Sequence, residues 1–303
     1  MAQSQGRVRN ALREPLTIAA LVILGLVVIA ALFAPLIATA DPSTQELTSV
    51  LSGSSSKHWL GTDDLGRDVF SRLIYGARVS LLASIIATAV AVVIGVPLGV
   101  ISGYFGGWAD MVLMRIFDTI LSFPAVVLAV GVGAALGPGL VHSMSAVGVV
   151  FSPVLARLAR GQVLTIKERL FVSVAYTYGS SNWRVIRRHV LPNIVQPLIV
   201  QCALLMGVAL LAEASLSFLG VGVRPPTASW GSMLQESFQF ISQRPISVYW
   251  PGIVIALTVL SFNAIGDALQ DIFDPNGVTI GARKLLKGAG SKSVQQPIEG
   301  GVA

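Results

Sequence analysis

Residues able to perform acid–base, metal or nucleophilic chemistry are sparse in this sequence. Charged residues make up only 12% of its 303 residues. The three histidines, His58, His142 and His189, are far apart and fall on different expected sides of a membrane, so they do not predict a shared metal site. Neither a Gly-x-Ser-x-Gly nucleophile elbow nor a His-Glu-x-x-His zinc motif occurs. We therefore expect no catalytic residue, metal or cofactor on this chain.

The sequence also lacks a nucleotide-binding fingerprint. Gly290-Ser291-Lys292-Ser293 superficially resembles a phosphate-binding loop, but no glycine directly precedes the lysine and no strand pattern precedes the segment. Both features are needed to cradle phosphate groups with backbone N–H groups. The protein is therefore not expected to be an enzyme, and any ATP hydrolysis linked to it would take place on a separate chain.

A group of potential metal ligands lies in the polar segment between the first two hydrophobic runs. Its members are His58, Asp63, Asp64 and Asp68. Their spacing is irregular for a metal site, and Arg67 stands among them. A hydrated loop with an internal Arg–Asp pair is the better interpretation, and residues 52–56, Ser-Gly-Ser-Ser-Ser, have the composition of a linker.

Glu213 is the one acid well inside a hydrophobic run. A carboxylate within a membrane is by default a candidate for a functional site, here in a passage across the membrane. The alternative is a structural hydrogen bond that ties helices together near the outer end of the span. We favour the structural role, because proton relays usually require a chain of ionisable groups.

The composition of the chain predicts that the elements holding these residues in place are membrane helices. Hydrophobic residues make up 53% of the sequence, and the mean hydropathy is +0.74. In such an apolar chain, the net charge of +6 favours topology signals or contact with anionic lipid over nucleic-acid binding. The single cysteine, Cys202, cannot form an internal disulfide.

The hydrophobic runs predict six transmembrane helices in an all-α membrane protein. The expected spans are Leu16–Ala38, Val79–Ile101, Val112–Leu136, Leu140–Leu158, Ile194–Leu219 and Val248–Leu269. The first could instead be a signal peptide cleaved after Ala38-Thr39-Ala40, but it is longer than a signal core, so a retained anchor is expected.

Basic residues concentrate in the segments that would lie inside the cell if both termini are cytoplasmic. This bias predicts a multi-pass protein of the cytoplasmic (inner) membrane. The expected divisions are a cytoplasmic tail at 1–15, an anchor at 16–38, an extracytoplasmic linker at 39–78, a five-helix core at 79–275 and a disordered cytoplasmic tail at 276–303.

The second span contains small residues at every fourth position, which follow one ridge of a helix. They are Ala83, Ala87, Ala91, Gly95, Gly99, Gly103 and Gly107. Small side chains let membrane helices approach closely, so we expect Gly95, Gly99 and Gly103 to pack against another helix. Pro97, Pro124 and Pro153 favour bent helices around a passage, although prolines are also tolerated in simple anchors.

A short amphipathic helix is predicted after Pro225-Pro226. After the two prolines, an apolar face recurs at helical spacing through Trp230, Leu234, Phe238 and Ile241, which predicts a helix on the membrane surface or over the passage. Residues 165–193 are predicted to form a separate, basic hairpin.

The hairpin is predicted to contain two short helices that each have one apolar face. Ile166, Leu170 and Val174 mark the first face, Gly179 breaks the helix, and Ser180 and Ser181 offer capping oxygens. The second helix has Trp183, Ile186 and Val190 on its apolar face, arginines 184, 187 and 188 opposite, and its end at Pro192. It is either a solvated loop that obeys the positive-inside rule or a docking surface for another chain.

The hairpin resembles the cytoplasmic coupling loop of ABC-importer permeases. Gly179 and the ending His189-Val190-Leu191-Pro192-Asn193 match that loop, whereas Ser173 stands where the family has glutamate. Two further segments, 58–68 and 212–231, resemble the dipeptide, oligopeptide and nickel branch (DppC/OppC type), as does the ending Gly266–Leu269 with Asp274-Pro275. The resemblance extends over about residues 58–275.

The resemblance implies an importer-type permease fold and a set of partners. These are a homologous second permease subunit, two cytoplasmic ATPase subunits that bind ATP and Mg²⁺, an extracytoplasmic substrate-binding protein and the lipid bilayer. The substrate class implied is di- or oligopeptides. The ATPase-coupling residues would be Phe171, Val174, Ala175, Tyr178, Gly179, Arg184, Arg188 and Pro192. An ion-driven secondary transporter and a non-transporting membrane adaptor are the alternatives.

Overall fold

A computed structural model describes residues 13–137 and 139–273, and these residues form a bundle of helices. Within the described ranges no strand occurs, and the only β-type pairing is an isolated bridge between Thr62 and Asp68. The tail expected at 276–303 and most of the tail expected at 1–15 lie outside the described residues.

Five helices of the described chain are long and apolar enough to cross a membrane. A sixth crossing is possible where a bent pair of helices forms one broken span. The five are α2 (Pro15–Leu32), α4 (Val69–Phe105), α7 (Leu140–Lys167), a continuous helix Asn182–Phe218 and α12 (Ile246–Phe273); the bent pair is α5 (Gly107–Leu121) with α6 (Ala125–Leu136). The all-α fold is confirmed, and five of the six expected spans are single long helices, while the sixth corresponds to the bent pair.

Several helices extend beyond the apolar runs that predicted them. Helix α4 begins at Val69 rather than Val79, so part of the segment expected as linker is helical, and α7 continues to Lys167 rather than Leu158. Helices depend on backbone hydrogen bonds, so charged residues end an apolar run without ending the helix. At about 1.5 Å per residue, α4 is about 55 Å long and exceeds the roughly 30 Å hydrocarbon core.

Two expected spans are interrupted at prolines. The run Val112–Leu136 divides into α5 and α6, whose axes differ by 96°, and Pro124 occupies the N-cap of α6. The anchor expected at 16–38 ends as α2 at Leu32 and continues, after a break at Phe33, in the short helix α3 (Ala34–Ile37) that contains Pro35. Proline lacks the N–H that a continuing helix needs, which accounts for both breaks. By contrast, Pro97 and Pro153 lie inside the uninterrupted helices α4 and α7.

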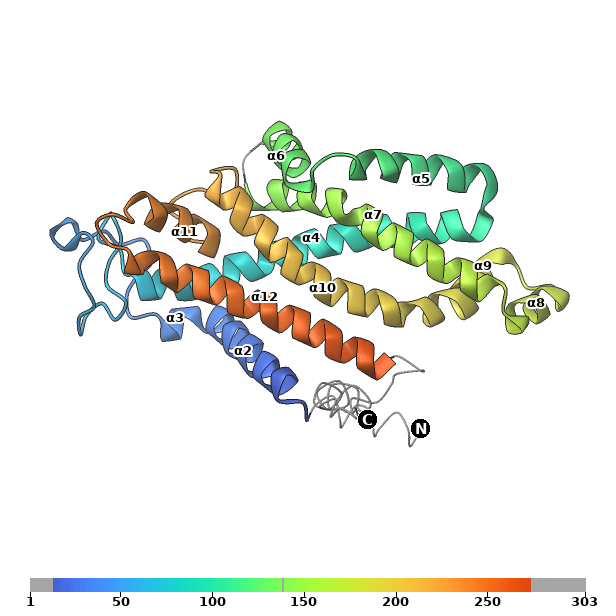
Figure 1. Cartoon of the computed structure of the whole chain (residues 1–303), viewed down its shortest axis with the longest axis horizontal. Helices are drawn as coiled ribbons and strands as arrows, with labels where there is room; N and C mark the ends of the chain where they lie inside the picture. Colours follow the sequence, from blue (N-terminus) through green and yellow to red (C-terminus); the bar gives the residue numbers. More distant parts are fainter. Residues whose placement is uncertain (1–12, 138, 274–303) are drawn as a thin grey trace, which may run out of the picture.

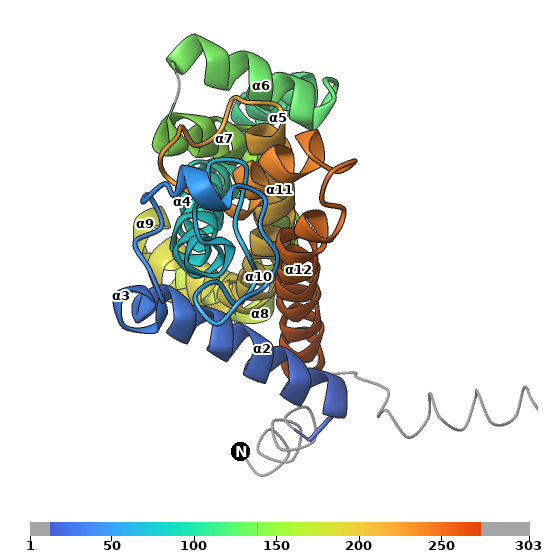
Figure 2. The same cartoon turned by 90° about the vertical axis from the view of Figure 1, so that its left-hand side faces the viewer.

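Helix α4 lies at the centre of the bundle, with α7, α10, α12 and α2 around it (Figure 2). Helix α10 (Leu191–Phe218) packs on α12, α4 and α7, while α2 packs on α12 and α4. Helix α11 (Trp230–Gln239) and the loops that follow α3 gather at one end of the molecule, which we call the α11 end. Helix α8 (Leu170–Thr177) lies at the opposite α8 end, together with α9 (Asn182–Val185) (Figure 1).

Candidate functional site

Helix α8 presents an apolar surface that the rest of the described chain does not cover. Its buried residues are Val172 and Ala175, which belong to a core cluster shared with α4, α7 and α10. Five of the other large apolar side chains in and beside α8 are exposed. They are Leu170, Phe171, Val174, Tyr178 and Trp183. We call these five residues the α8 surface; it combines exposed apolar side chains with a folded, anchored backbone, as a docking surface requires.

The structure corrects the apolar face predicted for the first hairpin helix. Ile166 is buried but belongs to the end of α7, and after a break at Glu168 and Arg169 the new helix begins at Leu170. Leu170 and Val174 point outward, since Val172 and Ala175 occupy the buried side. The predicted periodicity fails because the break changes the direction of the chain between Ile166 and Leu170.

Gly179 ends α8 in a Schellman motif. Its φ angle is +73°, its N–H bonds to the carbonyl of Tyr176, and the N–H of Ser180 bonds to the carbonyl of Ala175. A side chain at this left-handed position would be strained, which explains the glycine. Ser181 then occupies the N-cap of α9, but its hydroxyl makes no capping hydrogen bond.

The second helix of the hairpin is not short, and Pro192 does not end it. The helix that begins at Asn182 passes through a π-helical turn, η2 (Ile186–Val190), and continues as α10. The N–H of Leu191 bonds to the carbonyl of Ile186 across this turn. The wider turn changes the hydrogen-bonding register just before the proline, so the missing N–H of Pro192 is tolerated.

The same π-helical turn separates residues that were expected to share a face. Val185, Ile186 and Val190 are buried, whereas Trp183 is 68% exposed. A π turn contains an extra residue, so positions before and after it do not follow one helical period. Trp183 therefore lies on the exposed side, together with three basic side chains. These are Arg184, Arg187 and Arg188.

Glu213 is buried and hydrogen-bonded to residues of more than one helix. Its carboxylate accepts hydrogen bonds from the hydroxyl of Ser80 in α4 at 3.0 Å and from that of Ser217 in α10 at 2.7 Å. The N–H of Trp230, the first residue of α11, in turn donates to the hydroxyl of Ser80. Glu213 thus connects α4, α10 and α11 near the α11 end, and 1% of its surface is exposed.

Gly95, Gly99 and Gly103 lie directly against α7. A Cβ atom added at Gly99 would lie 2.8 Å from the Cα of Ala156, and one added at Gly103 would lie 2.8 Å from the carbonyl oxygen of Arg160. Gly95 faces the carbonyl of Ser152 in the same way. The helix that meets the small-residue ridge is therefore α7. Gly107 lies beyond the ridge, at the start of α5, and has open space beside it.

The polar segment before α4 is packed against α11 instead of forming a hydrated loop. The expected Arg–Asp pair is present, with Arg67 Nε donating to Asp63 Oδ2 at 2.6 Å. Arg67 and Arg72 also each donate to Glu236 of α11 at 2.9 Å, and both arginine side chains are buried. No local sequence pattern indicates Glu236 as the partner, because it is remote in the chain from both arginines.

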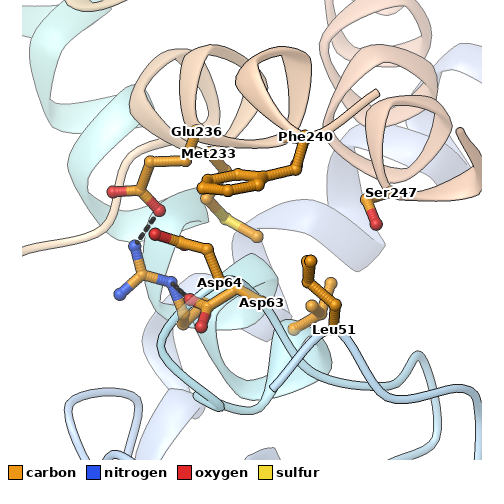
Figure 3. Close-up of a pocket in the computed structure, with 10 residues that line it drawn as sticks. Leu51, Asp63, Asp64, Met233, Glu236, Phe240 and Ser247 are labelled. Atoms are coloured by element: carbon orange, nitrogen blue, oxygen red, sulfur yellow. Dashed lines mark hydrogen bonds and ion pairs between the residues drawn. The ribbon is translucent and has the colours of Figure 1, made fainter. Parts of the chain in front are cut away.

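Three carboxylates of this cluster, those of Asp63, Asp64 and Glu236, turn toward one another beside a small pocket (Figure 3). Burial raises the pKa of Glu236, while the two arginines oppose this effect. Burial, and then the neighbouring Asp63, raises the pKa of Asp64. Since the arginines already neutralise most of the negative charge, the arrangement is that of an ion-pair cluster between the linker and α11.

His58 and Asp68 also make structural contacts. Asp68 is the N-cap of α4, where its Oδ2 accepts from the N–H of Ser71 at 2.8 Å, and its Oδ1 is 2.9 Å from His58 Nδ1. Burial opposes ionisation of Asp68, but hydrogen bonds from Ser71, His58 and Thr39 outweigh it and lower its pKa. A charged N-cap also interacts favourably with the helix dipole. Together these residues fix the start of α4.

The fold and the exposed α8 surface define the class as an importer-type membrane permease. The chain belongs to the family described as the binding-protein-dependent transport system inner membrane component, which matches residues 95–276. Residues 4–52 match a second family, the N-terminal TM domain of oligopeptide transport permease C. The resemblance expected from the sequence is confirmed, and membership of this family decides against an ion-driven transporter and a non-transporting adaptor.

Curated relatives match most of the chain. It is 43% identical to the dipeptide transport system permease protein DppC of Alkalihalophilus pseudofirmus, over 87% of this chain and 86% of that protein. It is 42% identical to the probable D,D-dipeptide transport system permease protein DdpC of Escherichia coli, over 86% and 88%. The glutathione transport system permease protein GsiD of Escherichia coli is 39% identical, over 87% of each chain.

A solved structure shares the fold. A chain of the MetNI methionine ABC transporter, in an inward-facing conformation, aligns with a TM-score of 0.57 at 16% identity. The alignment covers 67% of this chain and 97% of that chain. The likeness supports the importer-type fold and extends over the core rather than the whole of the chain.

Proposed function

We propose that this protein is the transmembrane permease subunit of a binding-protein-dependent ABC importer for di- or oligopeptides. It forms half of the translocation passage, and a homologous permease subunit forms the other half. The observation that carries the coupling role is the α8 surface, where large apolar side chains remain exposed on a helix anchored through Val172 and Ala175. The peptide substrate rests on the names of the dipeptide and glutathione permeases to which the chain is similar.

Coupling to ATP follows from the geometry of the α8 end. Two cytoplasmic ATPase subunits would bind ATP and Mg²⁺, and one of them would receive the α8 surface in an apolar groove. The surrounding Arg184, Arg187 and Arg188 favour an acidic rim on that groove. When the ATPase subunits close, they would move α8 and switch the passage between outward- and inward-facing states.

The α11 end would receive substrate from the extracytoplasmic binding protein. Arg244, which follows α11, is buried and donates to the carbonyls of Thr62 at 2.8 Å and Leu60 at 3.2 Å. Together with the ion-pair cluster at Glu236, it joins the linker and α11 into one platform. In this orientation the protein is a multi-pass component of the cytoplasmic membrane with both termini in the cytoplasm.

Val174→Asp tests the docking role of α8. Val174 is half exposed, so a charge there is tolerated in the free chain, but in an apolar groove an unpaired carboxylate costs several kcal/mol. We expect the variant to insert into the membrane normally, to lose co-purification with the ATPase subunits and to lose ATP-driven peptide uptake. Ser54→Asp, which adds the same charge to an exposed residue at the α11 end, should keep assembly with the ATPase. Normal uptake by Val174→Asp would contradict the proposal.

A further inference from the structure

Tyr104 is buried where four helical segments meet at the α8 end. It is the residue before the last of α4, and 3% of its surface is exposed. It belongs to the same core cluster as Val163 of α7, Val172 of α8 and Val185 of α9. Tyr104 of α4 therefore contacts α8 and also the two helices that flank α8 in the chain, α7 before it and α9 after it.

Polar contacts fix Tyr104 to each of these neighbours. Its hydroxyl is hydrogen-bonded to the hydroxyl of Tyr176 in α8 and donates to Oδ1 of Asn182, the first residue of α9, at 3.3 Å. Lys167, the last residue of α7, donates from Nζ to the carbonyl of Tyr104 at 2.7 Å, and its Nζ lies 5.7 Å from the centre of the Tyr104 ring.

The contact between Tyr104 and Tyr176 differs in kind from the rest of the attachment of α8. The buried side of α8 consists of Val172 and Ala175, whose apolar contacts are non-directional. Among the residues that the structure describes, the Tyr104–Tyr176 pair makes the only side-chain hydrogen bond between α8 and a membrane-spanning helix. A hydrogen bond depends on distance and angle, so it fixes the position of α8 along α4 as apolar packing alone does not.

We propose that Tyr104 is a positioning residue that makes the membrane-spanning helices follow the movement of α8. The inference rests on the proposed coupling function and assigns the step by which that movement reaches the bundle. Displacement of α8 acts on α4 through the two hydroxyls and on the long helix Asn182–Phe218 through Asn182. From α4 it passes to α7 along the close contact at Gly95, Gly99 and Gly103.

The test uses the complete transport complex in proteoliposomes, with its binding protein and radiolabelled dialanine as the probe. The quantity measured is dialanine taken up per ATP hydrolysed, with the melting temperature of the complex recorded in parallel. Tyr104→Phe and Tyr176→Phe each remove one hydroxyl and keep the ring. We expect each to lower the ratio on the order of fivefold, a factor typical of one hydrogen bond, while ATP hydrolysis and assembly persist.

The double variant Tyr104→Phe/Tyr176→Phe shows whether the two hydroxyls act as one contact. We expect it to lower the ratio no further than either single variant, since both remove the same interaction. Tyr75→Phe removes a hydroxyl near the opposite end of α4 and should keep the ratio of the wild type. If Tyr104→Phe prevents assembly, Tyr176→Phe on the exposed helix provides the same test.

Three results would overturn the inference. An unchanged ratio in both single variants would show that the hydroxyl contact does not transmit movement. Equal losses of uptake and ATP hydrolysis, accompanied by a lower melting temperature, would reduce Tyr104 to a purely structural role. A wild-type complex that hydrolyses ATP but takes up no dialanine would contradict the proposed peptide-import function itself, and the inference with it.

Discussion

At the scale of single residues, Glu213 allows a structural role to be separated from proton transfer. Its carboxylate accepts hydrogen bonds from Ser80 and Ser217, and glutamine at this position would keep one acceptor oxygen at nearly the same place. We expect Glu213→Gln to transport almost normally. Leucine would leave the serine hydroxyls without an acceptor, so Glu213→Leu should lose about 1–3 kcal/mol of stability.

ATP-driven uptake by Glu213→Gln in proteoliposomes, measured between about pH 5 and 8, checks this expectation. The pH profile of the variant should follow that of the wild type, because a carboxylate that only ties helices together doesn't exchange protons during transport. An inactive but fully assembled Glu213→Gln complex would assign a proton-transfer role to the residue.

The sequence identifies Glu213 but not its neighbours. An acid in a hydrophobic run attracts notice by itself, and its burial follows from the cost of exposing a charge to lipid. Ser80 and Trp230 are remote from Glu213 in the chain, and neither residue type is unusual in a membrane protein. Glu236 could not be predicted for the same reason, because its partners Arg67 and Arg72 are 169 and 164 residues away in the sequence. Tertiary partners of this kind have no local signature.

At the scale of helices, the packing of α4 on α7 depends on the absence of side chains. Gly99 lies so close to Ala156 that any side chain there would push the two helices apart. We expect Gly99→Leu to destabilise the folded protein by about 1–3 kcal/mol, which is typical of overpacking. Thermal unfolding of the detergent-purified protein measures the loss.

Gly161→Leu is the matched control for this prediction. Gly161 lies on α7, the helix that packs against Gly99 of α4, but a Cβ atom added at Gly161 would meet nothing within 4 Å. Its melting temperature should stay close to that of the wild type. A Gly99→Leu variant as stable as Gly161→Leu would show that the two helices can separate without cost.

Periodicity predicts helices better than it predicts their ends. The small-residue ridge can be predicted from the sequence because α4 is regular from Ala83 to Gly103. The helix that packs on this ridge, α7, can be identified only from the fold. The hairpin was harder to predict. The expected stop at Pro192 assumed an ordinary α-helix, whereas the π-helical turn η2 accommodates the proline and joins the hairpin to α10. Such turns have no simple sequence pattern.

At the scale of the whole molecule, the two ends of the bundle differ in character. The α8 end presents apolar and basic side chains, including Arg184, Arg187 and Arg188. The α11 end is closed by the ion-pair cluster around Glu236 and by Arg244. Composition and hydrophobic runs predict the number of spans, since burial in lipid demands long apolar helices. The assembly of the α11 end could not be predicted in this way, because its polar segments pack through specific long-range ion pairs.

The orientation of the bundle is the last expectation open to a direct test. The positive-inside rule places the arginine-rich α8 end in the cytoplasm, and the linker, which contains Ser54, outside. Ser54→Cys and Ser173→Cys, each in a Cys202→Ser background, place one exposed thiol at either end. A membrane-impermeant maleimide should label Ser54→Cys in intact cells and Ser173→Cys only in inside-out vesicles. The opposite pattern would invert the proposed topology and remove the α8 surface from the reach of any cytoplasmic ATPase.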